Sequence, residues 1–194
     1  MIVRRPRTED AEAMGRAVTS SWLVAYEGLM PESFLSTLDA ERSAQIWRER
    51  LSSGAAYQEG GLEGSVLVIC DEHGRVVGMS VHGADRVDRQ ALTAELWAIY
   101  IAPENWQQGC GRLLLKATEA DMRAQGSREA VLWVLRDNER AKGFYASMGW
   151  KPDGRSVLDA SRGFAIEELR YRRALASEPA SRPREVTLDG PRRR

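Results

Sequence analysis

Apolar positions recur at helical spacing through the first quarter of the chain. Residues 2–5 read as a short strand, and Thr8, which two acids follow, is typical of a helix N-cap. That helix is expected to run toward Trp22, and Pro31 interrupts the helical pattern after it. A further apolar stripe predicts a second helical segment through Ala44, Ile46, Trp47 and Leu51.

Strand-like patterning takes over in the middle of the chain. Residues 54–64 are rich in glycine and are predicted to form a loop. The run 65–84 reads as two strands joined by the turn Glu72-His73-Gly74, which makes a hairpin. A third strand of this group is expected over 92–102, where Pro103 stops it.

The pattern then alternates between helix and strand. Residues 112–125 follow helical spacing, and the run 129–136 is almost continuously apolar, as expected for a strand covered on both faces. Asn138 is placed to cap the next helix. Residues 155–158 and 164–172 read as closing strands.

Charge and composition exclude several classes of partner. The chain carries 28 basic and 28 acidic residues, so it has no general attraction for nucleic acid or for an anionic membrane. Two cysteines and two histidines make neither a disulfide framework nor a metal-binding cluster, so no metal is expected. The first residues lack the apolar run of a signal peptide, and no stretch approaches the roughly 20 apolar residues of a membrane span. A cytoplasmic protein without a nucleic-acid or membrane partner is therefore predicted.

The length predicts a single folded domain followed by a tail. A chain of 194 residues suffices for one well-buried core and leaves little room for a second. Residues 1–174 are assigned to this domain. Residues 175–194 are rich in proline, serine and arginine and are predicted to be disordered, with a short docking arm as the alternative.

Two glycines one residue apart, in Gly109-Cys110-Gly111, stand between a strand and a helix. Such glycines can let several backbone N–H groups and the helix dipole face one phosphate. Alternatively, they only relieve strain in a strand-to-helix turn. The stretch is neither a P-loop nor a dinucleotide fingerprint, because no Gly-Lys-Ser/Thr follows and Leu114 replaces the third glycine.

The surrounding sequence resembles one family. The stretch AELWAIYIAPENWQQGCGRLLL, followed by LWVLRDNERAKGFYASMGWKPDG, resembles the GNAT superfamily of acyl-CoA-dependent N-acyltransferases over about Val66 to Arg172. The resemblance implies an α/β fold of the α+β type, with a splayed, mixed and mostly antiparallel sheet flanked by helices. It also implies that acetyl-CoA binds as co-substrate in the cleft where the strands over 92–102 and 129–135 diverge.

The same resemblance implies which groups bind the cofactor. The family's signature is Gln or Arg, two residues, Gly, one residue, then Gly or Ala, and Trp106 departs from it in the first position. Asn138 resembles the family's asparagine that contacts the CoA arm, with the N-cap as the alternative. Main-chain groups are expected to pair with the pantetheine arm, to stabilise the thioester oxyanion and to hold the pyrophosphate. They belong to Ile99, Tyr100 and Ile101 in the strand and to Gln107, Gln108, Gly109, Cys110, Gly111 and Arg112 in the loop.

Glu95 is the candidate catalytic base, since an ammonium must lose its proton before it can attack. In a strand of period two it is expected to share a face with Trp97, Ile99 and Ile101, an unusual place for a charge in a pure core. Its separation from the glycines also resembles that of the basic glutamate in the histone-modifying branch of the superfamily. The alternative is a strand-end charge that reaches solvent or an arginine.

Tyr145 is the candidate acid that protonates the leaving thiolate, because a phenol is a suitable donor. It lies seven residues after Asn138, two helical turns along roughly the same face. The alternative is a packing role beside Phe144 and Met148. Several aromatic residues line either an acceptor pocket or only the core: Trp22, Tyr26, Trp47, Trp97 and Trp133.

The resulting interpretation is an N-acetyltransferase that moves an acetyl group directly from acetyl-CoA to a primary amine. A small-molecule acceptor is favoured because no extended charged docking strip is visible. Acetylation of a protein N-terminus or lysine, with a peptide as substrate, is the first alternative. A non-catalytic CoA-binding or interaction module is the second, and homodimer formation stays open.

Overall fold

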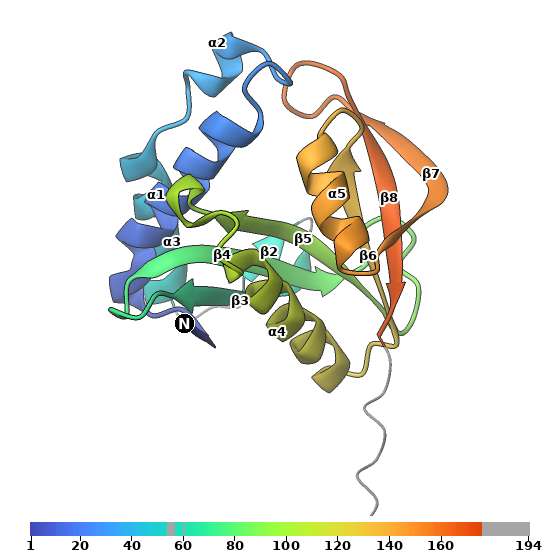
Figure 1. Cartoon of the computed structure of the whole chain (residues 1–194), viewed down its shortest axis with the longest axis horizontal. Helices are drawn as coiled ribbons and strands as arrows, with labels where there is room; N and C mark the ends of the chain where they lie inside the picture. The colour runs from blue at the N-terminus through green and yellow to red at the C-terminus, as the bar shows by residue number, and fades with distance from the viewer. Residues whose placement is uncertain (54–56, 60, 176–194) are drawn as a thin grey trace, which may run out of the picture.

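The structure, a computed structural model, describes residues 1–53, 57–59 and 61–175. Its strands form one mixed sheet, with helices on both sides (Figure 1). The strands are β1 (Ile2–Arg4), β2 (Tyr57–Glu59), β3 (Leu62–Cys70), β4 (Val76–Ala84), β5 (Thr93–Ile101), β6 (Glu129–Leu135), β7 (Lys151–Asp159) and β8 (Ile166–Ala174). The helices are α1 (Ala11–Ala25), α2 (Glu32–Leu35), α3 (Ala40–Ser52), α4 (Cys110–Ala124) and α5 (Glu139–Ser147), with 3-10 turns η1 (Thr8–Asp10) and η2 (Pro103–Asn105).

The strand order is β1-β3-β4-β5-β6-β8-β7, and β2 also pairs with β3. Every described pair is antiparallel except β5 with β6, which the α4 crossover joins in parallel. The parallel pairing runs from Thr93 with Glu129 to Leu96 with Leu132 and then ends. Beyond that point the two strands diverge, so the predicted splayed, mostly antiparallel sheet is confirmed.

Helices cover both faces of the sheet because each face of the central strands is apolar. The α1 and α3 helices pack on one face of the β3–β5 half through Met14 and Trp47. The opposite face receives α4 through Leu114 and Leu115, and α5 lies beside α4 against β6 and β8 (Figure 1). Where β5 and β6 stop pairing, α1 therefore lies on one face of the sheet, and α4 and α5 lie on the other face.

A bulge in β5 changes which side chains share a face. Trp97 is an extra residue relative to β4, so the alternation of side chains inverts beyond it. Ile99 and Ile101 consequently pack toward α4. The prediction that Glu95 shares a face with these two isoleucines is therefore wrong. The prediction that Glu95 shares a face with Trp97 holds, because the Arg86 guanidinium contacts both side chains.

Three local predictions also differ from the structure. Thr8 is not a helix N-cap but the first residue of a 3-10 turn. The start of this turn is held by the Asp10 carboxylate, which accepts a hydrogen bond from the Arg7 backbone N–H at 2.6 Å. The predicted loop over 54–64 contains β2 and the start of β3, with Gly61 in the turn at a φ of 75° that favours glycine. Leu175, the first residue of the predicted tail, is buried in the core. The rest of the predicted tail lies outside the described residues.

Candidate active site

The start of α4 presents backbone N–H groups without helical partners. The first bond of this helix runs from the Leu113 N–H to the Gly109 C=O at 3.0 Å, which leaves the amides of Cys110, Gly111 and Arg112 unpaired within the helix. No side chain caps this end, and α4 alone among the described helices has no acid in its first turn. The residues present therefore fit an anionic group.

The loop before α4 is held in a conformation suited to that role. Both Gln107 and Gly109 have positive φ, at 60° and 85°, which turns the chain sharply at the helix start. The side chain of Gln108 donates to the Glu104 carbonyl at 2.7 Å and fixes the loop to η2. The Cys110 side chain points into the core, where burial raises the pKa of its thiol, so only its backbone faces the loop.

The edge of β5 beyond Leu96 is open on the side of β6. The Ala102 N–H donates to the Val77 carbonyl at 2.9 Å, and the register pairs Tyr100 with Met79. Hydrogen-bonded pairs alternate along an antiparallel ladder, so the main chain of Tyr100 faces β4. The main-chain groups of Ile99 and Ile101 consequently point to the diverging edge. Of the strand residues predicted to pair with pantetheine, these two are oriented for it and Tyr100 is not.

Trp106 closes part of that edge. Its indole N–H donates to the Ile101 carbonyl at 2.6 Å, and its ring lies under the guanidinium of Arg140, 3.4 Å from the ring centroid. Arg140 belongs to the first turn of α5, so the pair joins the two elements that flank the opening between β5 and β6. No feature of the sequence alone indicated this contact.

Asn138 acts as the N-cap of α5. Its Oδ1 accepts a hydrogen bond from the Ala141 N–H at 3.0 Å, and the side chain is buried. The capping alternative is therefore correct for this structure. A role toward CoA stays a prediction.

Tyr145 lies on α5 within the core shared by α4, α5 and β6. Only 8% of the residue is exposed, and its phenol makes none of the hydrogen bonds found among the described residues. Burial raises the pKa of Tyr145, with a further contribution from nearby Tyr100. The phenol therefore stays protonated at neutral pH and is available as a hydrogen-bond donor.

Glu95 is fully buried and bonded to Arg86. Its Oε1 accepts from the guanidinium at 2.6 and 3.0 Å, and its Oε2 accepts from the Arg86 backbone N–H at 2.7 Å. Burial raises the pKa of Glu95, while Arg86 acts in the opposite direction. This geometry favours the alternative of an arginine-paired carboxylate, and the role of Glu95 as base stays a prediction.

Two further residues lie at the same opening: Tyr26, for which the sequence left an acceptor pocket or the core open, and Glu168, which no sequence motif singled out. The pKa of the Tyr26 phenol is raised by burial and then by nearby Tyr100, Tyr145 and Glu168. These neighbours come from β5, α5 and β8, so the Tyr26 hydroxyl stands among three elements that surround the divergence. The sequence did hold an indication of Glu168, because Glu167 and Glu168 are charges inside a strand, between the apolar residues Ile166 and Leu169.

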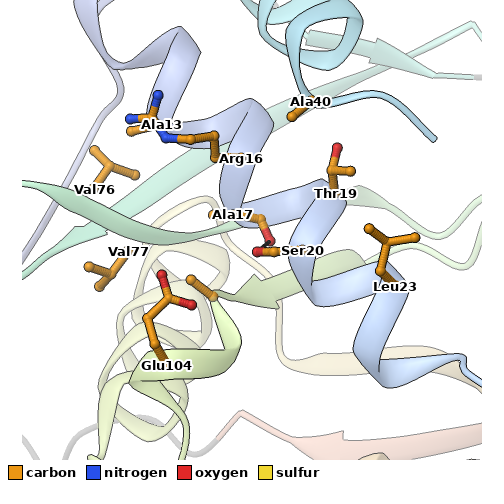
Figure 2. A pocket seen from close by; sticks show the side chains of 11 residues that line it. Ala13, Arg16, Ala17, Thr19, Ser20, Leu23, Ala40, Val76, Val77 and Glu104 are labelled. Atoms are coloured by element: carbon orange, nitrogen blue, oxygen red, sulfur yellow. Dashed lines mark hydrogen bonds between the residues drawn. The ribbon is translucent and has the colours of Figure 1, made fainter.

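A separate pocket of about 360 Å³ lies between α1, the start of β4 and η2. Figure 2 shows Ser20 and Leu23 of α1 on one side of it and Val77 and Glu104 on another. None of the predicted catalytic or cofactor-binding residues lines it, so it has no assigned part in the reaction.

The described residues contain no group of three histidine, cysteine, aspartate or glutamate residues that could hold a metal ion. Within the same residues, no helix is long and apolar enough to cross a membrane.

Comparison with known proteins gives a consistent result. The family model described as the acetyltransferase (GNAT) family matches residues 23–150. The chain is 28% identical to the uncharacterized N-acetyltransferase YuaI of Bacillus subtilis over 138 residues, which is 71% of this chain and 73% of YuaI. It is also 26% identical to a spermidine N(1)-acetyltransferase of Thermoplasma acidophilum over 169 residues, which is 87% of this chain and 96% of the relative.

Solved structures show the same fold. The PaiA N-acetyltransferase of Thermoplasma acidophilum in complex with coenzyme A superposes with a TM-score of 0.67 at 21% identity, covering 89% of this chain and 98% of that one. A ribosomal-protein-alanine N-acetyltransferase of Brucella melitensis gives a TM-score of 0.62 at 21% identity, covering 90% and 99%. At these identities the likeness establishes the arrangement of strands and helices.

Proposed function

The chain belongs to the acetyltransferase (GNAT) family, and on that basis we propose that it transfers the acetyl group of acetyl-CoA directly to the primary amine of a small molecule. One observation carries the proposal. The unpaired amides at the start of α4 and the open edge of β5 meet where β5 and β6 diverge. Together they offer one site for a pyrophosphate and one for an extended amide-bearing chain, which are the two polar parts of the CoA arm.

The loop amides are proposed to hold the pyrophosphate. The N–H groups of Cys110, Gly111 and Arg112 are the unpaired donors of the first turn of α4. The positive φ angles of Gln107 and Gly109 turn the preceding loop sharply just before these donors. The main chain of Ile99 and Ile101 is proposed to pair with the pantetheine amides. One of these N–H groups also stabilises the oxyanion that forms when the thioester carbonyl is attacked.

Direct transfer requires the amine nitrogen to attack the carbonyl carbon, after which the carbon–sulfur bond breaks. The neutral amine loses one proton after the attack and the thiolate gains one, so the transfer itself balances. An acceptor that arrives as an ammonium first releases one further proton to solvent. We assign proton donation toward the sulfur to Tyr145, because its buried phenol remains protonated. An alkyl ammonium is only about one part in 10³ neutral at pH 7, so a carboxylate near the acceptor is also required.

The acceptor class is inferred from a relative. The likeness to a spermidine N(1)-acetyltransferase favours a small cationic amine. Acetylation of a peptide N-terminus or lysine remains the alternative, and the fold likeness to a ribosomal-protein-alanine N-acetyltransferase does not discriminate between the two.

A thiol-release screen tests the proposal. The full chain is incubated with acetyl-CoA and, separately, with diamines, polyamines, amino acids and short peptides, and free CoA is measured. Release that depends on a small amine, with the acetylated amine identified by mass spectrometry, is expected. Tight CoA binding without transfer to any acceptor would instead support a non-catalytic CoA-binding module.

A further inference from the structure

Glu168 in β8 is a half-buried carboxylate. It forms no hydrogen bond and no ion pair with any other of the residues that the structure describes. Charged side chains in such surroundings are normally paired, because removing a carboxylate from water is costly. An unpaired one in this place points to a group that the protein alone does not supply.

The strand register gives the position of this carboxylate. Glu168 in β8 pairs with Leu135, the last residue of β6, on the face opposite the α4 and α5 core. Leu135 lies three residues beyond Leu132, at which the pairing of β5 with β6 ends. At about 3.3 Å per residue, Glu168 is therefore level with the open part of β5, on the side of α1.

Other charges near Glu168 are paired with one another. Burial raises the pKa of Glu168, with further effects from Arg162, Asp159, Arg86 and Glu95. Arg162 forms an ion pair with Asp159, and Arg86 with Glu95. The two guanidinium groups thus already have carboxylate partners, and the charge of Glu168 is left for a cation.

Aromatic side chains surround the same space. Trp22 contacts Tyr26 with ring centroids 4.6 Å apart and Tyr100 at 6.3 Å. Trp22 and Tyr26 also pack against the apolar cluster that contains Leu135, the strand partner of Glu168. Above them, the turn between β7 and β8 reaches α2, where Phe34 and Phe164 meet at 5.2 Å (Figure 1). Aromatic faces attract an ammonium group and pack against an alkyl chain.

We propose that Glu168 receives the ammonium group of a cationic alkyl amine, with Trp22, Tyr26 and Tyr100 as the wall around its carbon chain. This assignment rests on the proposed function, since it names the acceptor class and the acceptor subsite of that same reaction. The CoA arm would approach from the side of α4 and α5, and the amine from the side of α1. Both would meet where β5 and β6 diverge.

The test compares Glu168→Gln with the wild-type chain. Glutamine keeps the shape and removes the charge. The Michaelis constant for putrescine is expected to rise about 10- to 100-fold, the usual range for loss of a charge-assisted hydrogen bond. The rate with aniline, whose amine is uncharged at pH 7, is expected to change less than about twofold, because no ammonium is recognised. Equal loss with putrescine and aniline, or no loss with putrescine, would overturn the assignment.

Glu167→Gln is the matched control. Glu167 is the neighbouring acid on the other face of β8, where it forms a surface ion pair with Arg136. Its substitution removes the same charge and is expected to leave the Michaelis constant for putrescine and the rate with aniline unchanged.

Calorimetric titration of the CoA complex with putrescine separates the two levels of the proposal, because it needs no turnover. Weaker putrescine binding in Glu168→Gln supports the subsite even if the wild-type chain transfers no acetyl group. Equal putrescine affinity in the two chains, with unchanged CoA binding, rejects the subsite even if the wild-type chain is an active acetyltransferase.

Discussion

The guanidinium of Arg140 lies 3.4 Å from the centroid of the Trp106 ring. Trp106 occupies the position where the signature of the resembled superfamily has Gln or Arg, and its indole is bonded to the Ile101 carbonyl. A cation from α5 is thus held over the indole that stands in this position. Burial lowers the pKa of the Arg140 guanidinium, and nearby Tyr26 acts in the opposite direction.

Arg140→Ala is expected to weaken CoA binding about tenfold or more. A guanidinium near the loop would make a charge-assisted contact to a phosphate, and such contacts contribute about 1.5–3 kcal/mol. Calorimetric titration with CoA measures the effect, which should shrink as salt is raised. Arg136→Ala, which removes a surface arginine at the other end of the β6–α5 connection, serves as control. Equal affinities for all three chains would refute a phosphate contact by Arg140.

Tyr145→Phe is expected to lower turnover at least tenfold and to leave the affinity for CoA nearly unchanged. Phenylalanine keeps the ring contacts with Phe144, Trp150 and Tyr171 and removes only the hydroxyl. Loss of a positioned proton donor usually costs about 10²–10⁴ in rate. Steady-state kinetics at saturating acetyl-CoA give the answer, and a wild-type turnover number in the variant would exclude the role.

Gly109→Ala and Gly143→Ala make the same chemical change in two backbone conformations. Gly109 has a φ of 85°, so alanine there should lower the free energy of unfolding by about 1–2 kcal/mol and weaken CoA binding by moving the loop amides. Gly143 lies inside α5 with nothing within 4 Å of an added Cβ, so alanine should raise stability by about 0.5–1 kcal/mol. Urea denaturation distinguishes the two, and a stabilising Gly109→Ala would contradict the role given to its conformation.

Arg86→Ala tests the partner of Glu95. Removing the guanidinium leaves a fully buried carboxylate with only the backbone N–H of residue 86 as a donor among the described residues, and loss of a buried ion-pair partner typically costs about 3–5 kcal/mol. The double variant Arg86→Ala with Glu95→Gln should recover part of that loss, because no buried charge remains. Denaturation of both single variants and the double variant completes the cycle. Additive effects would show that the two side chains are not coupled.

The pH dependence of stability gives an independent view of Glu168. Its pKa is raised in the folded chain, chiefly by burial, so the folded state holds this proton more tightly than the unfolded state. The stability that Glu168 contributes is therefore complete below the unfolded pKa and is lost as the pH rises through the folded pKa. Glu168→Gln should be more stable than the wild-type chain at pH 7 and equal to it near pH 3.5. Thermal denaturation at several pH values checks this, and a less stable variant at pH 7 would indicate that Glu168 is paired.

Local sequence determined most of the elements. The period of apolar residues located the β3–β4 hairpin, β5, α4 and β6, because one face or both faces of each element must be buried. It failed at residues 54–64, where glycine-rich sequence hid a short strand that depends on pairing with β3. It also failed at Trp97, because a bulge is set by the partner strand and leaves no trace in the alternation of one strand.

The sequence by itself determined the strand-to-helix turn at Gly109 and the cap at Asn138, since these depend on residues adjacent in the chain. Its resemblance to a known superfamily predicted the fold class, which the strand order confirms. Only the tertiary structure decided the rest of the site. It paired Glu95 with Arg86, placed Arg140 over Trp106, and set Glu168 opposite Leu135 with no ion-pair partner among the described residues. These relationships join residues that are distant in sequence, and the divergence of β5 and β6 is what brings them to one opening.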